Sequence, residues 1–215
     1  MRFNKAIGDF CCVSLFILTS LLAGCATYSP AERGELTPAD ILKGKEAVVS
    51  SESCEFRVVI LKDRDLAKRY VGIDPVESSM IPVFMRIANS GNRLIKLDAS
   101  GSSLLTAAGE PFQSLTIDEA IEKAMRSDAE VVGWGIAFGT VGAIVSASNT
   151  ASTNKSLEED YHKKSFKPNL INTESSGEGL VFFHVPPEKQ EFINAAVIQL
   201  LDPTSNETKK VTVRF

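Results

Sequence analysis

Hydrophobic and polar residues alternate along several short stretches of the chain, which is the pattern of β-strands with a buried face. The clearest example is 210–215, in which every second residue is Val or Phe. The same pattern predicts strands at 56–61, 81–87, 94–97, 103–106, 180–185 and 195–201. Because turn-forming residues separate these stretches, about seven short strands are expected.

The residues between the strands predict how the strands connect. Ser90-Gly91-Asn92 predicts a tight turn that returns 94–97 as the partner of 81–87. Pro82 lacks an N–H group, which places the start of its strand at a sheet edge or a bulge. The composition of 175–179, Ser-Ser-Gly-Glu-Gly, predicts a further turn.

Short strands separated by turns favour a mainly β fold, an antiparallel sandwich. The layout resembles the immunoglobulin-like domains of bacterial envelope lipoproteins. That resemblance implies a sandwich with an immunoglobulin-like topology, although the disulfide and the buried Trp of antibody domains are absent.

Four helices are predicted beside the strands. One spans 37–44, where Thr37 is the N-cap and Pro38 the first helical residue, and a short charged one spans 63–70. Thr116-Ile117-Asp118-Glu119 is a capping box that opens an amphipathic helix. A charged return helix is expected over 157–164, so a helical insertion of about 116–166 interrupts the strands.

The stretch from Val131 to Ala147 contains no charged residue. Small residues recur at every fourth position in it, with Gly142 on the adjoining strip, and the stretch resembles the glycine-zipper segments of envelope proteins. Such a stripe leaves a groove in which a second backbone can approach closely. The helix-packing residues are Gly135, Gly139, Gly142, Ala143 and Ala147.

Three interpretations of 131–147 remain open. The segment packs on its own domain, or it forms a face between copies or with a protein partner, or it inserts into a membrane. As a helix it would be about 25 Å long against a hydrocarbon core of about 30 Å, which makes a full span marginal.

The N-terminus has the features of an export signal. Arg2 and Lys5 precede an apolar run over 10–22, which is shorter than the roughly 20 residues that a membrane-spanning helix needs. The small residues Ala23 and Gly24 then precede Cys25, as a cleavage site requires. An ordinary signal peptide, or an uncleaved anchor with a chance cysteine, is the alternative to a lipoprotein signal.

Leu22-Ala23-Gly24-Cys25 resembles the lipobox of bacterial lipoproteins. The resemblance implies cleavage between Gly24 and Cys25 and an acylated Cys25 that carries palmitate-type chains. Two or three acyl chains hold a protein on a membrane where one does not. In lipoproteins of two-membrane bacteria, an aspartate directly after the cysteine favours retention in the inner membrane, and this chain has Ala26 there. The resemblance therefore implies a location on the periplasmic face of the outer membrane. In another type of host, the location would be the inner membrane or the single cell membrane.

The lipobox divides the chain into a signal peptide at 1–24, a tether at 25–36 and a β domain at 37–215. Removal of the signal takes away Arg2, Lys5 and Asp9, which changes the formal net charge from −4 to −5. This mild acidity argues against a nucleic-acid partner, which would need a basic stripe. Cys54 is then the one unmodified cysteine, expected as a small core residue, with an intermolecular disulfide as the alternative.

Nothing in the sequence indicates catalysis, a metal or a cofactor. His162 and His184 are the two histidines, and neither lies at a metal-ligand spacing. His162 is expected on the solvated face of the return helix and His184 on the outside of a strand. The sequence therefore predicts a lipid-anchored, non-enzymatic structural or protein-binding module. The alternative is a membrane-active or oligomerising protein that acts through 131–147.

Overall fold

A computed structural model describes residues 46–51, 53–132, 155–167 and 170–215, with the backbone alone over 126–132. The signal, the tether, the helix predicted at 37–44 and most of the glycine-rich run lie outside these residues. Besides a helix over 155–164, the named elements are β1 (Ala47–Ser51), β2 (Cys54–Ile60), α3 (Arg64–Tyr70), α4 (Pro75–Ser78), β3 (Met80–Asn89), β4 (Lys96–Thr106), β5 (Pro111–Leu115), α5 (Ile117–Val132), β6 (Ser175–His184), α7 (Pro187–Gln190), β7 (Ile193–Asp202) and β8 (Glu207–Arg214).

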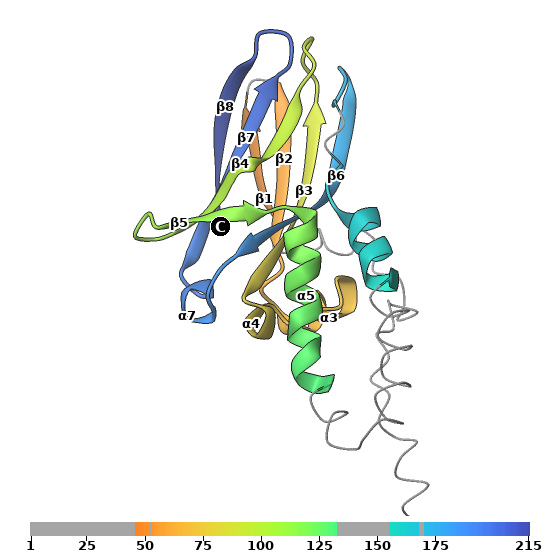
Figure 1. The fold of residues 1–215 in the computed structure, drawn as a ribbon. Coiled ribbons are helices and arrows are strands. Elements are labelled where there is room, and N and C mark those ends of the chain that lie inside the picture. Colours follow the sequence, from red (N-terminus) through yellow and green to blue (C-terminus); the bar gives the residue numbers. More distant parts are fainter. Residues whose placement is uncertain (1–45, 52, 133–154, 168–169) are drawn as a thin grey trace, which may run out of the picture.

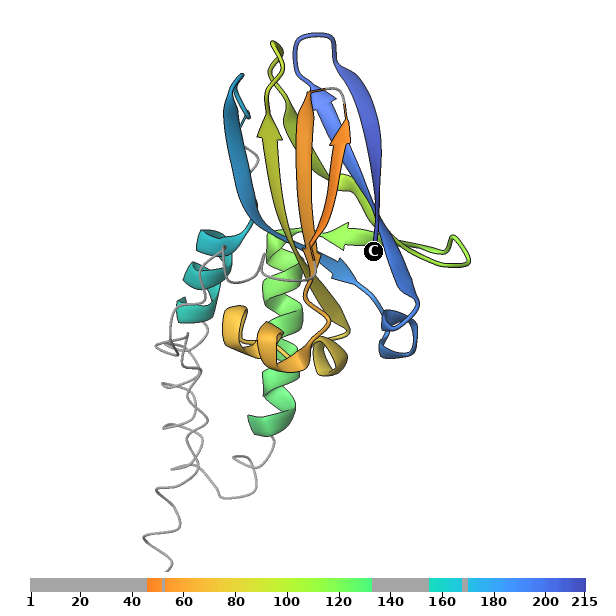
Figure 2. The same cartoon turned by 180° about the vertical axis from the view of Figure 1, so that it is seen from behind.

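The eight strands form one antiparallel sheet in the order β1-β2-β3-β6-β5-β4-β7-β8, which confirms a mainly β fold. The sheet curls until its first and last strands lie beside each other, so that it is nearly barrel-shaped (Figure 1). The β1–β2, β3–β4 and β7–β8 turns lie at one end of the sheet, called here the cleft end. The helices α3, α4, α5 and α7 lie at the other, the helical end (Figures 1 and 2).

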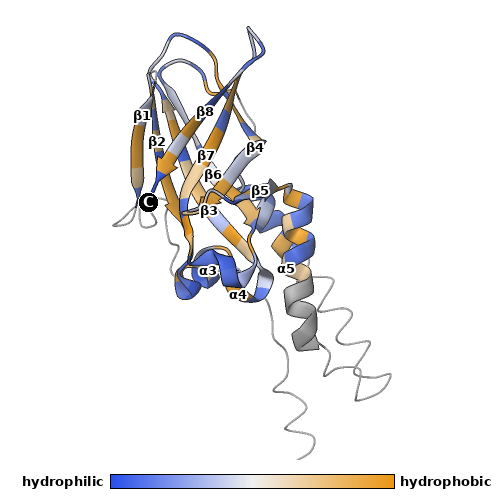
Figure 3. Ribbon diagram, turned by 90° about the vertical axis from the view of Figure 1, so that its left-hand side faces the viewer, coloured by the Kyte–Doolittle hydropathy of each residue, from blue (hydrophilic) through white to orange (hydrophobic). Residues whose placement is uncertain are grey.

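The central strands bury both of their faces. Residues on the inner face form the core of the barrel, such as Phe56, Val83 and Phe183. Residues on the outer face, such as Phe84 and Phe182, pack beneath α3, α5 and the helix over 155–164. Figure 3 shows hydrophobic residues along β2 and β3, whereas α3 is largely hydrophilic.

The helix α5 begins at the predicted capping box. The Thr116 N–H donates to Glu119 Oε2 at 2.8 Å, and the Glu119 N–H donates to Thr116 Oγ1 at 3.2 Å. These reciprocal bonds satisfy two N–H groups at the helix start. Ala120, Ile121 and Ala124 are buried, so the predicted apolar face is confirmed. No helix in the described part of the chain is both long and apolar enough to cross a membrane.

The predicted hairpin of 81–87 with 94–97 is wrong. β3 pairs with β2 and β6, whereas β4 pairs with β5 and β7. The Ser90-Gly91-Asn92 turn therefore carries the chain from one half of the sheet to the other. Asn89 holds this turn through bonds to Gly91 N, Arg93 O and Ile171 O, so it needs no hairpin ladder.

The prediction that Pro82 lies at a sheet edge or a bulge is also wrong, because β3 is a central strand with Pro82 directly opposite Phe182. The Leu61 N–H donates to Pro82 O, so the Pro82 backbone faces β2. Ladder pairing with β2 ends one residue earlier, at Ile60 opposite Val83. The missing N–H of Pro82 therefore lies just beyond the ladder, where no strand needs it.

The glycine-rich residues 175–179 form the first half of β6 and not a turn. Their glycines make room for a strap, defined here as residues 165–167 and 170–171, which crosses this half of β6. A Cβ on Gly177 would lie 3.1 Å from Phe166 Cζ, and one on Gly179 would lie 2.5 Å from Phe166 Cα. The close approach of the strap thus explains glycine in this strand.

The strap fills the part of the barrel that β5 does not reach. β5 pairs with β6 only at Phe182 and Phe183, near the helical end. Beyond it, the Phe166 N–H donates to Leu180 O at 2.8 Å, and Ile171 exchanges hydrogen bonds of 2.7 and 3.2 Å with Ile95. The strap thereby joins the two halves of the sheet.

Candidate binding cleft

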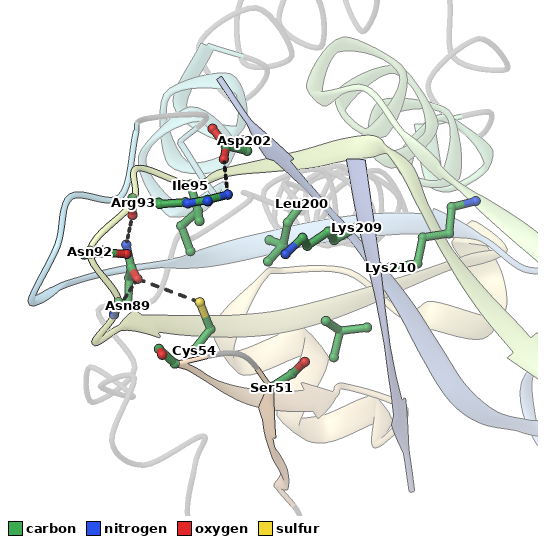
Figure 4. Close-up of a pocket in the computed structure, with 13 residues that line it drawn as sticks. Ser51, Cys54, Asn89, Asn92, Arg93, Ile95, Leu200, Asp202, Lys209 and Lys210 are labelled. Atoms are coloured by element: carbon green, nitrogen blue, oxygen red, sulfur yellow. Dashed lines mark hydrogen bonds and ion pairs between the residues drawn. The ribbon is translucent and has the colours of Figure 1, made fainter. Parts of the chain in front are cut away.

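A cleft of about 550 Å³ opens at the cleft end, between the β1–β2 turn, the β3–β4 turn and the β7–β8 hairpin (Figure 4). Its lining comes from segments that are distant in sequence but adjacent in the curled sheet. The described lining residues include Ser51, Cys54, Asn89, Arg93, Asp202 and Lys209.

Asn89 organises the wall of the cleft. Its side chain is buried, and its Nδ2 lies 2.8 Å from Arg93 O, 3.2 Å from Ile171 O and 3.1 Å from Asn172 O. Its Oδ1 accepts from the Gly91 N–H at 3.0 Å. One amide therefore ties β3, the turn that follows it and the end of the strap together, and its donors are consumed within the fold.

Cys54 is a core residue, as predicted. Its side chain is 7% exposed, and its Sγ lies 3.9 Å from Asn89 Oδ1. A thiol in this position is poorly placed for an intermolecular disulfide, because a second thiol must reach it directly.

The charged side chains around the cleft are mainly cationic. Arg93 Nη1 lies 3.5 Å from Asp202 Oδ2, and Figure 4 shows Lys209 directed across the cleft and Lys210 directed away from it. Asp202 is the single carboxylate among the described lining residues. Hydrogen bonds from the Thr204 and Ser205 N–H groups, together with Arg93, hold the pKa of Asp202 below its usual value, so it stays ionised.

A seam between β1 and β8 continues from the cleft along the barrel. These strands are the two ends of the sheet and lie next to each other, but no ladder joins them within the described residues. Each strand therefore presents backbone N–H and C=O groups toward the seam that no sheet neighbour uses. This edge is the feature of the site that is suited to binding.

The described cleft residues include no histidine and no nucleophile paired with a base. His162 is exposed on the helix over 155–164, and His184 is exposed at the end of β6, where its Nδ1 lies 2.9 Å from Ser79 O. Both positions agree with the sequence predictions. No three His, Cys, Asp or Glu side chains gather as a metal site in the described ranges.

A second charged cluster lies at the helical end around Asp74. The Asp74 side chain is 1% exposed, caps α4 through the Val76 N–H and pairs with Arg64 and Lys68. Burial alone would raise the pKa of Asp74. Hydrogen bonds from Arg64, from Lys68 and from the backbone N–H groups of Val76 and Glu77 outweigh this effect and lower the pKa to about 2. Because these partners lie on α3 and α4, the cluster fixes one helix against the other.

Asp74→Asn should destabilise the domain by about 2 kcal/mol at pH 7, as judged from the pKa difference. A pKa lowered in the folded state gives stability that is complete above about pH 4 and is lost as the pH falls toward 2. The difference between wild type and variant should therefore shrink below pH 4 in urea denaturation of the chain without residues 1–25. Asp63→Asn is the control, because Asp63 is an exposed cap of α3 that asparagine can replace. Equal losses for the two variants would contradict the role of the cluster.

The site residues predicted from the sequence are not among the described residues. Gly24 and Cys25 of the cleavage site lie outside the described residues, as do the helix-packing residues Gly135, Gly139, Gly142, Ala143 and Ala147. The cleft residues were not predicted. The available signal was Asn89 two residues before Gly91, because asparagine commonly bonds to the backbone N–H two residues on.

Comparisons with known proteins give no family. No protein-family model matches the sequence, and no curated protein matches it. Among solved structures, a functionally unknown protein from Listeria monocytogenes EGD-e aligns over 88% of this chain and 97% of its own, with 14% identity and a TM-score of 0.34. An ApaG protein from Pseudomonas aeruginosa PAO1 aligns over 74% of this chain and 88% of its own, with 14% identity and a TM-score of 0.27. Likenesses at these scores assign no function, which leaves the geometry of the chain itself to support one.

Proposed function

We propose that the chain is a lipid-anchored envelope protein whose β domain is a non-enzymatic module that binds proteins. The anchor is Cys25 of the lipobox-like stretch, and the compartment is the periplasmic face of the outer membrane. We include in the proposal an immunoglobulin-like sandwich topology, in which the half of the sheet around β3 faces the half around β7. The two halves share one inner core, which supports the face-to-face arrangement of that proposal.

The seam between β1 and β8 is the observation that carries the proposal. An extended segment of a partner can add to either edge through main-chain hydrogen bonds, while neighbouring pockets select its side chains. The cleft at the end of the seam provides such a pocket beside the two edges. A small-molecule site is less well supported, because the Asn89 amide and the Asp202 carboxylate are engaged within the fold.

Photo-crosslinking along the seam tests the proposal. A benzophenone amino acid is placed at Val48 on β1 or Thr212 on β8, both exposed, in cells that make the full chain. Both positions should crosslink to one segment of one partner, at residues an even number of positions apart, because alternate residues of an added strand share a face. The control is Glu188 on α7, which is exposed and distant from the seam. Crosslinks from Glu188 alone, or none from the seam, would rule out strand addition.

A second candidate is a membrane-active or oligomerising protein that acts through 131–147. The supporting observation is that α5 runs without interruption to Val132, inside the uncharged stretch. The two candidates differ in the residues that matter. Self-association that depends on Gly139 and not on the seam favours the second.

A further inference from the structure

Exposed apolar side chains gather at the helical end. Within the described residues, five large hydrophobic side chains are exposed, and three of them belong to this end: Val76, Phe192 and Phe215. Phe192 is the most exposed of the five, at 60%. Large apolar side chains that are exposed next to one another are a feature of interaction surfaces.

Hydrogen bonds connect the elements that carry these three side chains. The Gln190 Nε2 of α7 donates to Pro75 O of α4 at 2.7 Å, which places α7 against the helix that carries Val76. The Phe192 N–H donates to Lys189 O of α7 at 3.1 Å, and the Phe215 N–H donates to Asn194 O at 2.9 Å. Val76, Phe192 and Phe215 are called the apolar corner below.

The undescribed segments join the domain at this same end. Ala47 pairs with Val58 near the end of β2 that leads into α3, so residues 1–45 join the sheet at its helical end. The end of α5 and the start of the helix over 155–164 also lie beyond this end (Figures 1 and 2). The cleft lies at the opposite end of the sheet.

The tether predicted at 25–36 would not by itself orient the domain. As a flexible chain it would extend to about 40 Å and span about 20 Å when relaxed. A domain on such a tether turns freely unless a second contact holds it. The apolar corner is the described surface that can supply this contact.

We propose that the apolar corner rests on the lipid bilayer that holds Cys25, so that the cleft and the seam point away from the membrane. The proposal rests on the lipid anchoring proposed above. Basic and acidic residues are mixed beside the corner, with Lys189 and Arg214 near Glu188 and Glu191. The surface therefore fits zwitterionic headgroups, with the phenylalanines in contact with the interface and the lysine and arginine stems beside them.

Tryptophan fluorescence on vesicles tests the proposal. Trp134 is the single tryptophan of the chain, so Trp134→Phe removes the background. In that background, Phe192→Trp places the probe at the apolar corner. Leu170→Trp is the matched control, because Leu170 is 49% exposed and adjoins Ile171 near the cleft end. The full acylated chain is bound to phosphatidylcholine vesicles that contain brominated phosphatidylcholine.

Bromine should remove most of the emission of the Phe192→Trp variant, with a blue shift, and leave the Leu170→Trp variant unchanged. Adding Val76→Ser to the Phe192→Trp variant should reduce the quenching. The substituted side chains are exposed, so the variants should fold normally. Equal quenching of both probes, or no quenching at position 192 on vesicle-bound protein, would overturn the proposal. A blue shift at 192 that depends on protein concentration and not on lipid would assign the corner to a second copy.

A parallel arm separates failure of the anchor from failure of the orientation. The chain that begins at Cys25 is coupled through that thiol to a maleimide lipid on the same vesicles. If the native protein does not float with vesicles but the coupled protein shows quenching at 192 alone, the proposed anchoring fails and the orientation stands. If both proteins float and neither shows selective quenching, the orientation fails and the anchoring stands.

Discussion

Replacement of Cys25 with serine should abolish acylation of the chain and stop its processing at the Gly24–Cys25 bond. A serine hydroxyl lacks the thiol that the lipobox resemblance requires for the diacylglyceryl group. Each buried CH₂ contributes about 0.8 kcal/mol to membrane binding, so loss of two or three chains removes far more than the energy needed for stable anchoring. Intact-mass measurement of the purified protein and incorporation of labelled palmitate in cells report the change.

Cys12→Ser is the matched control for this prediction. Cys12 lies in the apolar run of the signal, and its loss should leave processing and acylation unchanged. Globomycin should cause the wild-type precursor to accumulate. Two outcomes would contradict the proposed location in the cell envelope. One is a wild-type protein whose first residue carries an unmodified thiol, and the other is labelled palmitate that persists in the Cys25→Ser variant.

Gly179→Ala should destabilise the β domain by about 3 kcal/mol, the upper range for overpacking. Gly179 has a φ of 157°, and an added Cβ would lie 2.5 Å from both the N and the Cα of Phe166. These are backbone atoms, so no side chain can rotate away. Relief requires the strap to move off β6, which breaks the hydrogen bond from the Phe166 N–H to Leu180 O.

Gly109→Ala separates the packing effect from the backbone effect. Gly109 has a φ of 82°, but a Cβ there would meet nothing within 4 Å. Its substitution should cost only the backbone penalty, about 1 kcal/mol. Urea denaturation of both variants, followed by circular dichroism, gives the comparison. Equal losses would show that the strap tolerates a methyl group.

Local patterns in the sequence predicted individual elements well. The capping box at Thr116, the charged helix at 63–70 and the clean alternation at 210–215 all correspond to observed elements. Each depends on contacts within a few residues, which a sequence displays directly. The buried Cys54 was also predicted, because it adjoins an apolar strand.

Strand pairing was harder to predict. The Ser90-Gly91-Asn92 turn indicates a reversal of the chain, but it does not reveal that the reversal crosses between the halves of the sheet. The glycines at 177 and 179 indicate a turn when the sequence is considered alone, because the strap that requires them, residues 165–167 and 170–171, is not adjacent to them in the pattern. The missed strands β1 and β5 are five residues each and carry few alternating hydrophobic residues.

The cleft depends on the same long-range relations. Cys54 and Asn89 lie opposite each other at the ends of β2 and β3, and the curling of the sheet brings Asp202, at the end of β7, to the same cleft. The hydrogen bonds from Asn89 to Ile171 and Asn172 join residues more than 80 positions apart. These hydrogen bonds could not be predicted from one sequence, because the residues near Asn89 in the chain do not indicate its distant partners.

The strap gives the two ends of the domain a mechanical connection. Its first residues follow directly from the helix over 155–164, where Lys164 Nζ donates to Tyr70 O, and its far end leads to Asn172, whose carbonyl accepts from Asn89. Force applied to that helix is therefore transmitted along a few covalently linked residues to the amide that shapes the mouth of the cleft. A pull on that helix would therefore reach Asn89 at the opposite end of the domain.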